Sequence, residues 1–347
     1  MKLPTGRAAM ATLVATEGSS PRSTGSRMWV DEAGRIVGSV TIGGCVDARV
    51  IEASAKALED NEPALLSMSL GDEDAWAIGM TCAGTIEVLV EPVDPAREGD
   101  PVSEALGIAA EEVGAGRPAV VVATLEGPPR RLVFTQRGAS GTLGDDGLDD
   151  AAAREAKSLL AGGVSGVREV RGRRLFFERQ APPLTLVVFG ATHVAMPLVA
   201  LGGVMGLRTV VVDGRDRFAT RDRFPGADEV LVGMPSELAE RMPLGRETLV
   251  VLLSHDYKYD LPVLRAVLES DAAYVGVLGS RRRGKALLEF LSGEGVPAEQ
   301  LARVRIPVGL DLGGNSPEEI ALSVLSEAVA VYHGRNGGPM RDRPATS

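Results

Sequence analysis

The stretch LTLVVFGATHVA, residues 184–195, decides the fold of the second half of this chain. Leu184–Phe189 is a continuous apolar run, which is typical of a parallel strand buried on both faces. The turn Gly190–Ala195 leads into a helix, and Arg208–Val212 predicts a second strand that ends in Asp213. Strands that alternate with helices in this order predict a parallel, Rossmann-like sheet.

The alternation continues toward the C-terminus. Thr248–Leu253 and Tyr274–Leu278 are apolar enough to be further buried strands, and Leu261–Leu268 predicts a helix between them. The last helix opens at Ser316–Glu319, where Ser, Pro and Glu have the spacing of a capping box. The sequence therefore predicts that residues 184–335 form one Rossmann-like domain, followed by a loose tail over residues 336–347.

The first half has a different pattern of shorter elements. Met28–Val30 and Arg35–Val40 predict a hairpin, and a helix is expected from about Val46 to Glu59. Gly138–Asp150 is predicted to be an exposed loop because it is rich in Gly and Asp. The Pro-marked segment Gln180–Pro183 predicts a linker, so residues 1–180 are expected to form a small mixed α+β domain.

Composition excludes several classes of function. The net charge is −10 and the pI is near 5, so the backbone of a nucleic acid would be repelled. No apolar run reaches the roughly 20 residues that a membrane span needs, and the N-terminus lacks the pattern of a secretory signal. Two cysteines do not form a disulfide framework. We therefore expect a cytoplasmic protein with reduced thiols.

The sequence TIGGCVD, residues 41–47, marks the first candidate site. Gly43 and Gly44 remove side chains at a turn, and Cys45 then stands at the start of the predicted helix. The positive end of a helix lowers the pKa of a thiol and favours the thiolate, which is nucleophilic and binds metals. Cys82 lies in a similar glycine-flanked loop, so the two thiols are expected to meet. The alternative is that both are small buried apolar residues at tight turns.

The Rossmann-like half offers a second candidate site. Gly190 opens the phosphate turn, and Asp213 has nearly the spacing expected for a ligand of a ribose hydroxyl. Thr192 stands where a dinucleotide pyrophosphate needs a bare glycine, so we expect weak binding of NAD(P). His193 in the turn and His255 at the end of a strand are expected to face the same crevice, although a lone histidine is more often structural.

Two further segments could bind an anion. Ser19, Ser20 and Arg22 form a hydroxyl-rich loop with one positive charge, whose alternative interpretation is an ordinary connection. Gly279, Ser280 and Arg281 begin a segment with three arginines at the predicted start of a helix, which suits a phosphate group. Some of these arginines can equally be solvated surface residues.

Taken together, these segments resemble the xanthine dehydrogenase accessory protein family, XdhC/CoxI. The resemblance rests on the order and spacing of the segments GSSPR, GSVTIGGCVD, TCAGTIEVLVEP, HDYKYD, YVGVLGSRRR and IPVGLDLGGNSPEEIALS. Thr192 and Ala195 depart from the GAGHVG turn that is usual in the family. The resemblance covers nearly the whole chain and implies a small N-terminal domain, a Rossmann-like C-terminal domain and a homodimer or larger oligomer.

The resemblance also implies a function. Proteins of this family bind molybdenum cofactor (molybdopterin) and pass it, in sulfurated form, into an apo-molybdenum hydroxylase alongside a cysteine desulfurase. Such a protein is a carrier and not a catalyst, with Cys45 or Cys82 as a plausible contact to the thiophilic metal. Two alternatives remain open at this point. One is an NAD(P)-dependent oxidoreductase that uses the Rossmann-like half, and the other is a scaffold that bridges the partner enzymes without holding cofactor.

Overall fold

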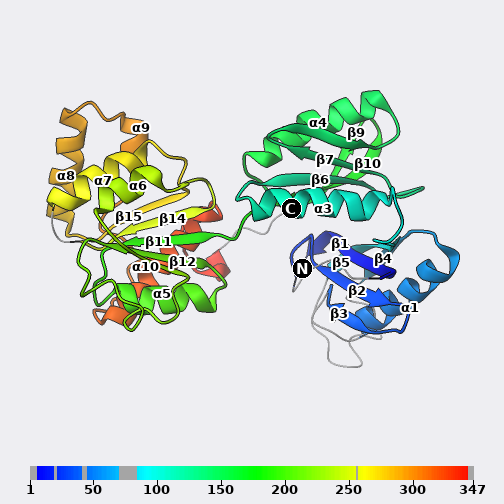
Figure 1. The fold of residues 1–347 in the computed structure, drawn as a ribbon, viewed down its shortest axis with the longest axis horizontal. Helices are drawn as coiled ribbons and strands as arrows, with labels where there is room; N and C mark the ends of the chain where they lie inside the picture. The colour runs from blue at the N-terminus through cyan, green and yellow to red at the C-terminus, as the bar shows by residue number, and fades with distance from the viewer. Residues whose placement is uncertain (1–5, 19–21, 41–44, 70–83, 255–256, 343–347) are drawn as a thin grey trace. The chain divides into compact units, whose positions relative to one another are not determined.

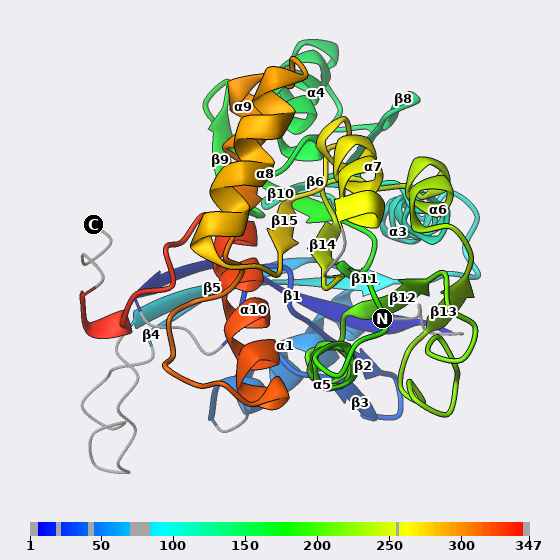
Figure 2. The ribbon, with the colours of Figure 1, turned by 90° about the vertical axis from the view of Figure 1, so that its left-hand side faces the viewer.

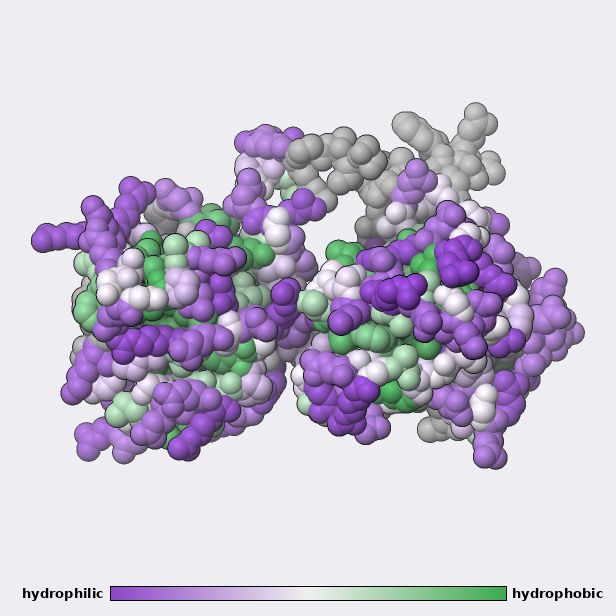
Figure 3. All heavy atoms as spheres, turned by 90° about the horizontal axis from the view of Figure 1, so that it is seen from above, coloured by the Kyte–Doolittle hydropathy of each residue, from purple (hydrophilic) through white to green (hydrophobic). Residues whose placement is uncertain are grey.

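The computed structural model describes residues 6–18, 22–40, 45–69, 84–254 and 257–342. The chain divides into two compact units, Met1–Pro182 and Pro183–Ser347, and both are built from strands and helices (Figure 1). Hydrophilic side chains predominate on the visible face of each unit, and apolar residues form smaller patches among these hydrophilic side chains (Figure 3). None of the helices in the described ranges is long and apolar enough to span a lipid bilayer. The predicted mixed α/β class is confirmed.

The N-terminal unit contains the same arrangement of strands twice. Its first sheet consists of β1 (Ala8–Gly18), β2 (Arg27–Asp31), β3 (Ile36–Gly38), β4 (Ala64–Ser69) and β5 (Gly84–Val93). Its second sheet consists of β6 (Ala119–Thr124), β7 (Arg131–Thr135), β8 (Gly138–Thr142), β9 (Gly166–Val170) and β10 (Arg173–Gln180). The strand orders, β3-β2-β1-β5-β4 and β8-β7-β6-β10-β9, are identical in topology. We call the two copies the first and second repeats.

Each repeat places one helix between its third and fourth strands. These helices are α1 (Cys45–Asp60) in the first repeat and α4 (Asp146–Leu160) in the second, and α3 (Pro101–Gly114) connects the two repeats. Alternate residues of β1 and β5 pack against α1, and alternate residues of β6 and β10 pack against α4. Because side chains alternate along a strand, the opposite faces of the two sheets are left to pack against each other. Val14, Leu89, Leu125 and Phe176 form that contact.

Two reciprocal ion pairs cross the contact between the sheets. Arg27, the first residue of β2, pairs with Glu178, the third residue from the end of β10. Arg131, the first residue of β7, pairs with Glu91, the third residue from the end of β5. Equivalent positions of the two repeats thus exchange partners, which shows that the repeats are related in space as well as in topology.

Two predictions for the N-terminal unit are corrected. Gly138–Asp150 is not a loop, because β8 pairs antiparallel with β7 and α4 already begins at Asp146. The Asp145 side chain caps that helix by accepting a hydrogen bond from the Leu148 N–H at 2.7 Å. The predicted strand Arg35–Val40 ends at Gly38, whose φ of +85° turns the chain out of the strand.

The C-terminal unit is a six-stranded parallel sheet in the order β13-β12-β11-β14-β15-β16. Its strands are β11 (Thr185–Phe189), β12 (Arg208–Asp213), β13 (Glu229–Val232), β14 (Thr248–Leu252), β15 (Tyr274–Val277) and β16 (Val304–Arg305). Its helices are α5 (Ala195–Val204), α6 (Pro235–Arg241), α7 (Tyr257–Leu268), α8 (Arg281–Gly293), α9 (Ala298–Leu301) and α10 (Pro317–Tyr332), followed by the short 3₁₀ helix η1 (Met340–Asp342). The predicted Rossmann-like sheet is confirmed, and the strand order reverses between β11 and β14.

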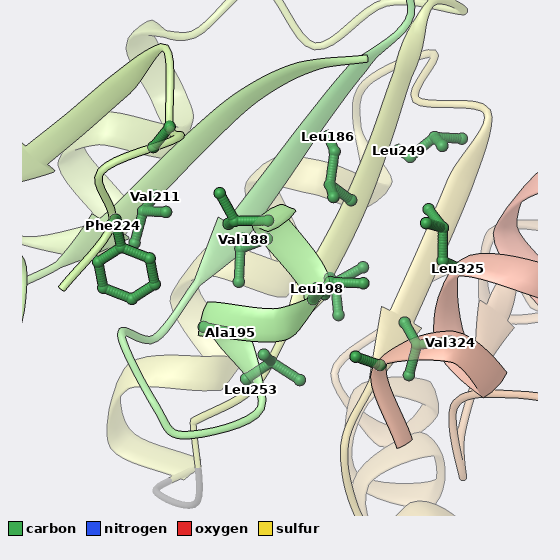
Figure 4. Packing of buried hydrophobic residues seen from close by; sticks show 14 of the residues in the cluster. Leu186, Val188, Ala195, Leu198, Val211, Phe224, Leu249, Leu253, Val324 and Leu325 are labelled. Carbon is green, nitrogen blue, oxygen red and sulfur yellow. The ribbon is translucent and has the colours of Figure 1, made fainter. Parts of the chain in front are cut away.

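Helices cover both faces of this sheet (Figure 2). On one face α5 and α10 pack against Leu186, Val188 and Leu249, and Figure 4 shows these side chains meeting Leu198 and Val324. On the other face α6, α7 and α8 cover a second apolar cluster. The strands are therefore buried on both sides, as the continuous apolar runs predict. The capping box at the start of α10 is also confirmed.

Candidate functional site: the crevice at the carboxyl edge of the parallel sheet

A crevice lies at the carboxyl ends of β11, β12 and β14, where the strand order reverses. Its volume is about 600 Å³, which is within the usual range for a small-molecule site. Open α/β sheets bind their ligands at this reversal, because the connecting loops diverge there and leave a gap. The residues that line it are Phe189, Gly190, Thr192, Asp213, Gly214, Arg215, Gly233, Met234, Pro235, Leu252, Ser254, Tyr259, Asp260 and Val263.

Glycines leave the backbone bare around the crevice. Gly190, Gly214 and Gly233 stand just beyond the ends of three neighbouring strands. Gly190 has a φ of +109°, and a Cβ atom there would come within 3.1 Å of the Ser254 nitrogen. Only glycine fits at that position without strain, which lets β11 and β14 stay close together beneath the crevice.

The turn after β11 is held from two sides. Its Ala191 N–H donates to Asp213 Oδ2 at 2.7 Å, and its Ala191 carbonyl accepts a hydrogen bond from Arg223 Nη1 at 2.9 Å. Thr192, the next residue, lines the crevice, and its buried hydroxyl oxygen has no hydrogen-bond partner within the described part of the chain. A buried hydroxyl without a partner costs about 1–3 kcal/mol, so this group is suited to a ligand.

Asp213 does not present a free carboxylate to the crevice. Its Oδ1 accepts hydrogen bonds from the N–H and the Nε of Arg215, both at 2.9 Å. Its Oδ2 accepts from Arg215 Nη2 and from the Ala191 N–H, both at 2.7 Å. A carboxylate has about four acceptor sites, and all four are occupied here. Asp213 therefore holds Arg215 and the turn, and it has no lone pair left for the ribose hydroxyl that the sequence spacing suggests.

The same contacts determine the charge state of this pair. Burial raises the pKa of the Asp213 carboxyl, but hydrogen bonds from Arg215 and from the Ala191 N–H more than offset that effect. The net pKa of Asp213 lies below its ordinary value of 3.8, and the Asp213 hydrogen bond raises the pKa of Arg215. Both groups are ionised at neutral pH, so the pair is a fixed dipole at the end of β12.

Arg215 is a candidate site residue that sequence reasoning missed. Its guanidinium lies 4.2 Å from the centre of the Phe218 ring, and its side chain is 57% exposed. The remaining walls are largely apolar, with Phe189, Leu252 and Met234 on the crevice. The signal available in the sequence was the order Asp-Gly-Arg at the end of a predicted strand, but nothing local shows that the arginine turns back onto the aspartate.

Four other predicted residues of this half are described and lie outside the crevice. His193 is exposed and is not among the lining residues. Ser280 caps α8, since its hydroxyl accepts a hydrogen bond from the Arg283 N–H at 3.2 Å, and Arg281 is exposed. Gly279 packs closely on Ile306, where a Cβ would come within 3.3 Å of the side chain. The structure thus brings together Gly190, Thr192 and Asp213, but it does not bring these four residues to them.

A second carboxylate, that of Asp260, lines the crevice and is buried. Asp260 of α7 is 2% exposed and accepts a hydrogen bond from Arg283 Nη2 at 2.8 Å. This ion pair connects α7 to the first turn of α8. Arg283 therefore neutralises a charge of the crevice wall and is not a solvated surface residue.

Several predicted site residues lie outside the described residues. These are Ser19, Ser20, Gly43, Gly44, Cys82 and His255, and the side chain of Cys45 is also outside the description. Arg22 is described and lies on the surface. Within the described ranges, no group of three or more His, Cys, Asp or Glu side chains is arranged to hold a metal ion.

The duplicated topology singles out the surroundings of the two cysteines. In the second repeat Asp145 precedes and caps α4, whereas the sequence has Gly44 directly before α1. The connection between β9 and β10 consists of Arg171 and Gly172, whereas residues 70–83, which include Cys82, connect β4 to β5. The first repeat therefore differs from the second at the two places where its cysteines occur.

Comparison with known proteins places the chain among a defined set of relatives. A family model described as the XdhC Rossmann domain matches residues 186–328, and one described as the XdhC and CoxI family matches residues 4–69. A protein of Bacillus subtilis that is described as a probable subunit of xanthine dehydrogenase is 28% identical over 326 residues, which are 93% of this chain and 92% of that protein.

Two further matches also extend over most of the chain. The molybdenum cofactor insertion chaperone PaoD of Escherichia coli is 26% identical over 331 residues, covering 93% of this chain and 83% of the relative. A crystal structure of a xanthine dehydrogenase from Bacillus halodurans has a TM-score of 0.73 at 26% identity, covering 98% of this chain and 95% of that one.

Proposed function

The chain belongs to the XdhC and CoxI family, and we propose that it is an accessory protein that binds molybdenum cofactor. In this proposal it protects the cofactor and delivers it, in sulfurated form, to an apo-molybdenum hydroxylase such as xanthine dehydrogenase. The protein acts as a carrier, so binding and release take the place of a catalytic step.

The similarity to a chaperone named for molybdenum cofactor insertion carries this proposal. It spans both units of the chain, so it includes the crevice of the C-terminal unit as well as both cysteines of the N-terminal unit. Because the fold alone does not determine function, the residues of the site must also suit the cofactor.

The described residues fit the organic part of the cofactor. A pterin is a planar, fused-ring heterocycle, and the crevice offers apolar walls and bare glycine backbone to such a ring. The exposed Arg215 guanidinium supplies polar contacts at its rim, and the buried Thr192 hydroxyl has no partner within the described residues. The cysteines of the N-terminal unit, Cys45 and Cys82, are a separate candidate contact for the metal, because soft sulfur ligands suit a metal that carries sulfur.

The partners and the location follow from the same proposal. We expect the protein to work with an apo-molybdenum hydroxylase and a cysteine desulfurase, as a homodimer in the cytoplasm. A two-fold dimer is the most common closed assembly of identical chains.

The test is the cofactor content of the purified protein. The full chain is produced in a molybdenum-replete host, and bound pterin is measured by fluorescence after release. Cys45→Ala is expected to keep the fold, judged by circular dichroism, and to lose most of the bound pterin, with a smaller loss in Cys82→Ala. Asp145→Ala is the matched control, because it alters the equivalent helix start of the second repeat and should keep the wild-type content. Wild-type protein that carries no pterin would refute the proposal.

A further inference from the structure

The crevice contains a guanidinium, that of Arg215, which its ion pair with Asp213 orients in advance. Asp213 binds Arg215 through Nε and Nη2, and Phe218 packs on one face of the guanidinium at 4.2 Å. The Nη1 group of Arg215 donates no hydrogen bond within the described part of the chain. An arginine held in this way has already lost side-chain freedom, so it can bind an anion at little further entropic cost.

The position of this charge differs from that of an ordinary dinucleotide site. In such sites the pyrophosphate lies against the glycine turn after the first strand, and the carboxylate after the second strand binds the ribose. Here Thr192 places a side chain in the turn, and the four acceptor sites of Asp213 are occupied. The anion position therefore moves to the end of β12, where Arg215 provides it.

The rest of the crevice suits a flat, uncharged ring. Phe189, Leu252 and Val263 form an apolar wall, and Met234 and Tyr259 stand at the rim with 49% and 42% of their surfaces exposed. The Thr192 hydroxyl can donate to or accept from a ring nitrogen or oxygen. The other carboxylate that lines the crevice, Asp260, is paired with Arg283, which reduces its repulsion of an anion.

We propose that this crevice binds a fused-ring nitrogen heterocycle that carries a single phosphomonoester, with Arg215 as the phosphate ligand and Asp213 as the residue that positions it. Two ligands share this chemistry. One is a free nucleoside monophosphate, and the other is the pterin phosphate of the molybdenum cofactor. The second of these rests on the proposed function, whereas the first rests on the crevice alone.

The experiment compares AMP with adenosine, which lacks only the phosphate, and adds a dinucleotide and a pterin phosphomonoester. Isothermal titration of the full-length protein uses AMP, adenosine, NAD and neopterin monophosphate. A phosphomonoester probe, AMP or neopterin monophosphate, is expected to bind at least ten times more tightly than adenosine or NAD, because only the monoester reaches Arg215. Equal affinity for AMP and adenosine, combined with no binding of neopterin monophosphate, would overturn the proposal, and so would the failure of both phosphomonoesters to bind.

Three variants locate the phosphate. Arg215→Ala is expected to weaken binding of the phosphomonoester at least tenfold and to leave binding of adenosine unchanged. Thr192→Val keeps the side-chain shape and should weaken the binding of both the phosphomonoester and adenosine. Arg208→Ala is the matched control, since Arg208 lies at the opposite end of the same strand and pairs with Glu229, and it should bind like the wild type. Arg215→Lys keeps the charge beside Asp213 in case the alanine variant does not fold, and should bind the phosphomonoester more weakly than the wild type.

Cofactor content separates this proposal from the proposed function. If phosphomonoester binding depends on Arg215 while the wild-type protein carries no pterin, the crevice is confirmed and the carrier function fails. If the wild type carries pterin and both Arg215 variants bind the probes like the wild type, the assignment of Arg215 is wrong and the carrier function stands.

Discussion

Removing one partner of the buried ion pair between Glu91 and Arg131 should strongly destabilise the N-terminal unit. Both side chains lie in the contact between the two sheets, where they are 1% and 5% exposed. Glu91→Gln removes the negative charge and leaves the Arg131 guanidinium buried with neutral acceptors, which are the amide oxygen of the new side chain and the Arg130 carbonyl at 3.0 Å. Breaking a buried pair by removing one partner costs about 3–5 kcal/mol. That is a large part of the roughly 5–15 kcal/mol that stabilises a typical domain.

The duplicated topology provides internal controls for this substitution. Glu178→Gln breaks the reciprocal pair, and because Arg27 is 16% exposed and can reach water, its cost should be smaller. Glu87→Gln breaks the pair with Arg174 at 2.5 Å, and Arg174 is 45% exposed. Exposed pairs contribute about 0–1 kcal/mol, so this variant should unfold like the wild type.

Tryptophan fluorescence during urea unfolding is a suitable assay. Both tryptophans, Trp29 and Trp76, belong to the N-terminal unit, so their signal reports on that unit alone. The double variant Glu91→Leu/Arg131→Met replaces the pair by apolar side chains and should recover most of the lost free energy, since such replacements are often neutral or stabilising. A cost of Glu91→Gln no larger than that of Glu87→Gln would refute this reasoning, as would a double variant that is as unstable as Glu91→Gln.

Three further predictions concern the C-terminal unit and the assembly. Gly190→Ala places a Cβ at a φ of +109° and within 3.1 Å of the Ser254 nitrogen, so it should destabilise the C-terminal unit by about 1–3 kcal/mol, measured by tyrosine fluorescence, and leave the tryptophan transition unchanged. An unchanged tyrosine transition would contradict this. Because the folded-state pKa of Asp213 is depressed, the ionised carboxylate stabilises the fold above the ordinary pKa of 3.8, and this stabilisation is lost as pH falls through the folded pKa. The difference in melting temperature between the wild type and Asp213→Asn should therefore close below pH 3.8. A difference that stays constant with pH would count against this reasoning. Light scattering should give the mass of a homodimer, and a monomer mass at micromolar concentration would exclude it.

Features that depend on neighbours in the chain could be predicted from the sequence by itself. The buried strands of the C-terminal unit appear as apolar runs, because both faces of a parallel strand are covered. The capping box at Ser316 depends only on residues within one helical turn. The bare turn at Gly190 and the departure at Thr192 were also visible, so the location of the crevice followed from the sequence.

Features that depend on distant partners were decided by the tertiary structure. β8 contains Gly-Ala-Ser-Gly-Thr, which has no strand pattern, and it is a strand because β7 provides hydrogen bonds along its length. The repeat is invisible in the sequence because the two copies preserve strand order and packing positions, which many apolar residues can satisfy. The sequence predicted that Asp213 ends a strand, but it did not predict which groups donate hydrogen bonds to its carboxylate. Whether the acceptor sites of a carboxylate are free depends on which donors the fold brings close to it. Here Arg215 and the Ala191 N–H donate hydrogen bonds to the Asp213 carboxylate.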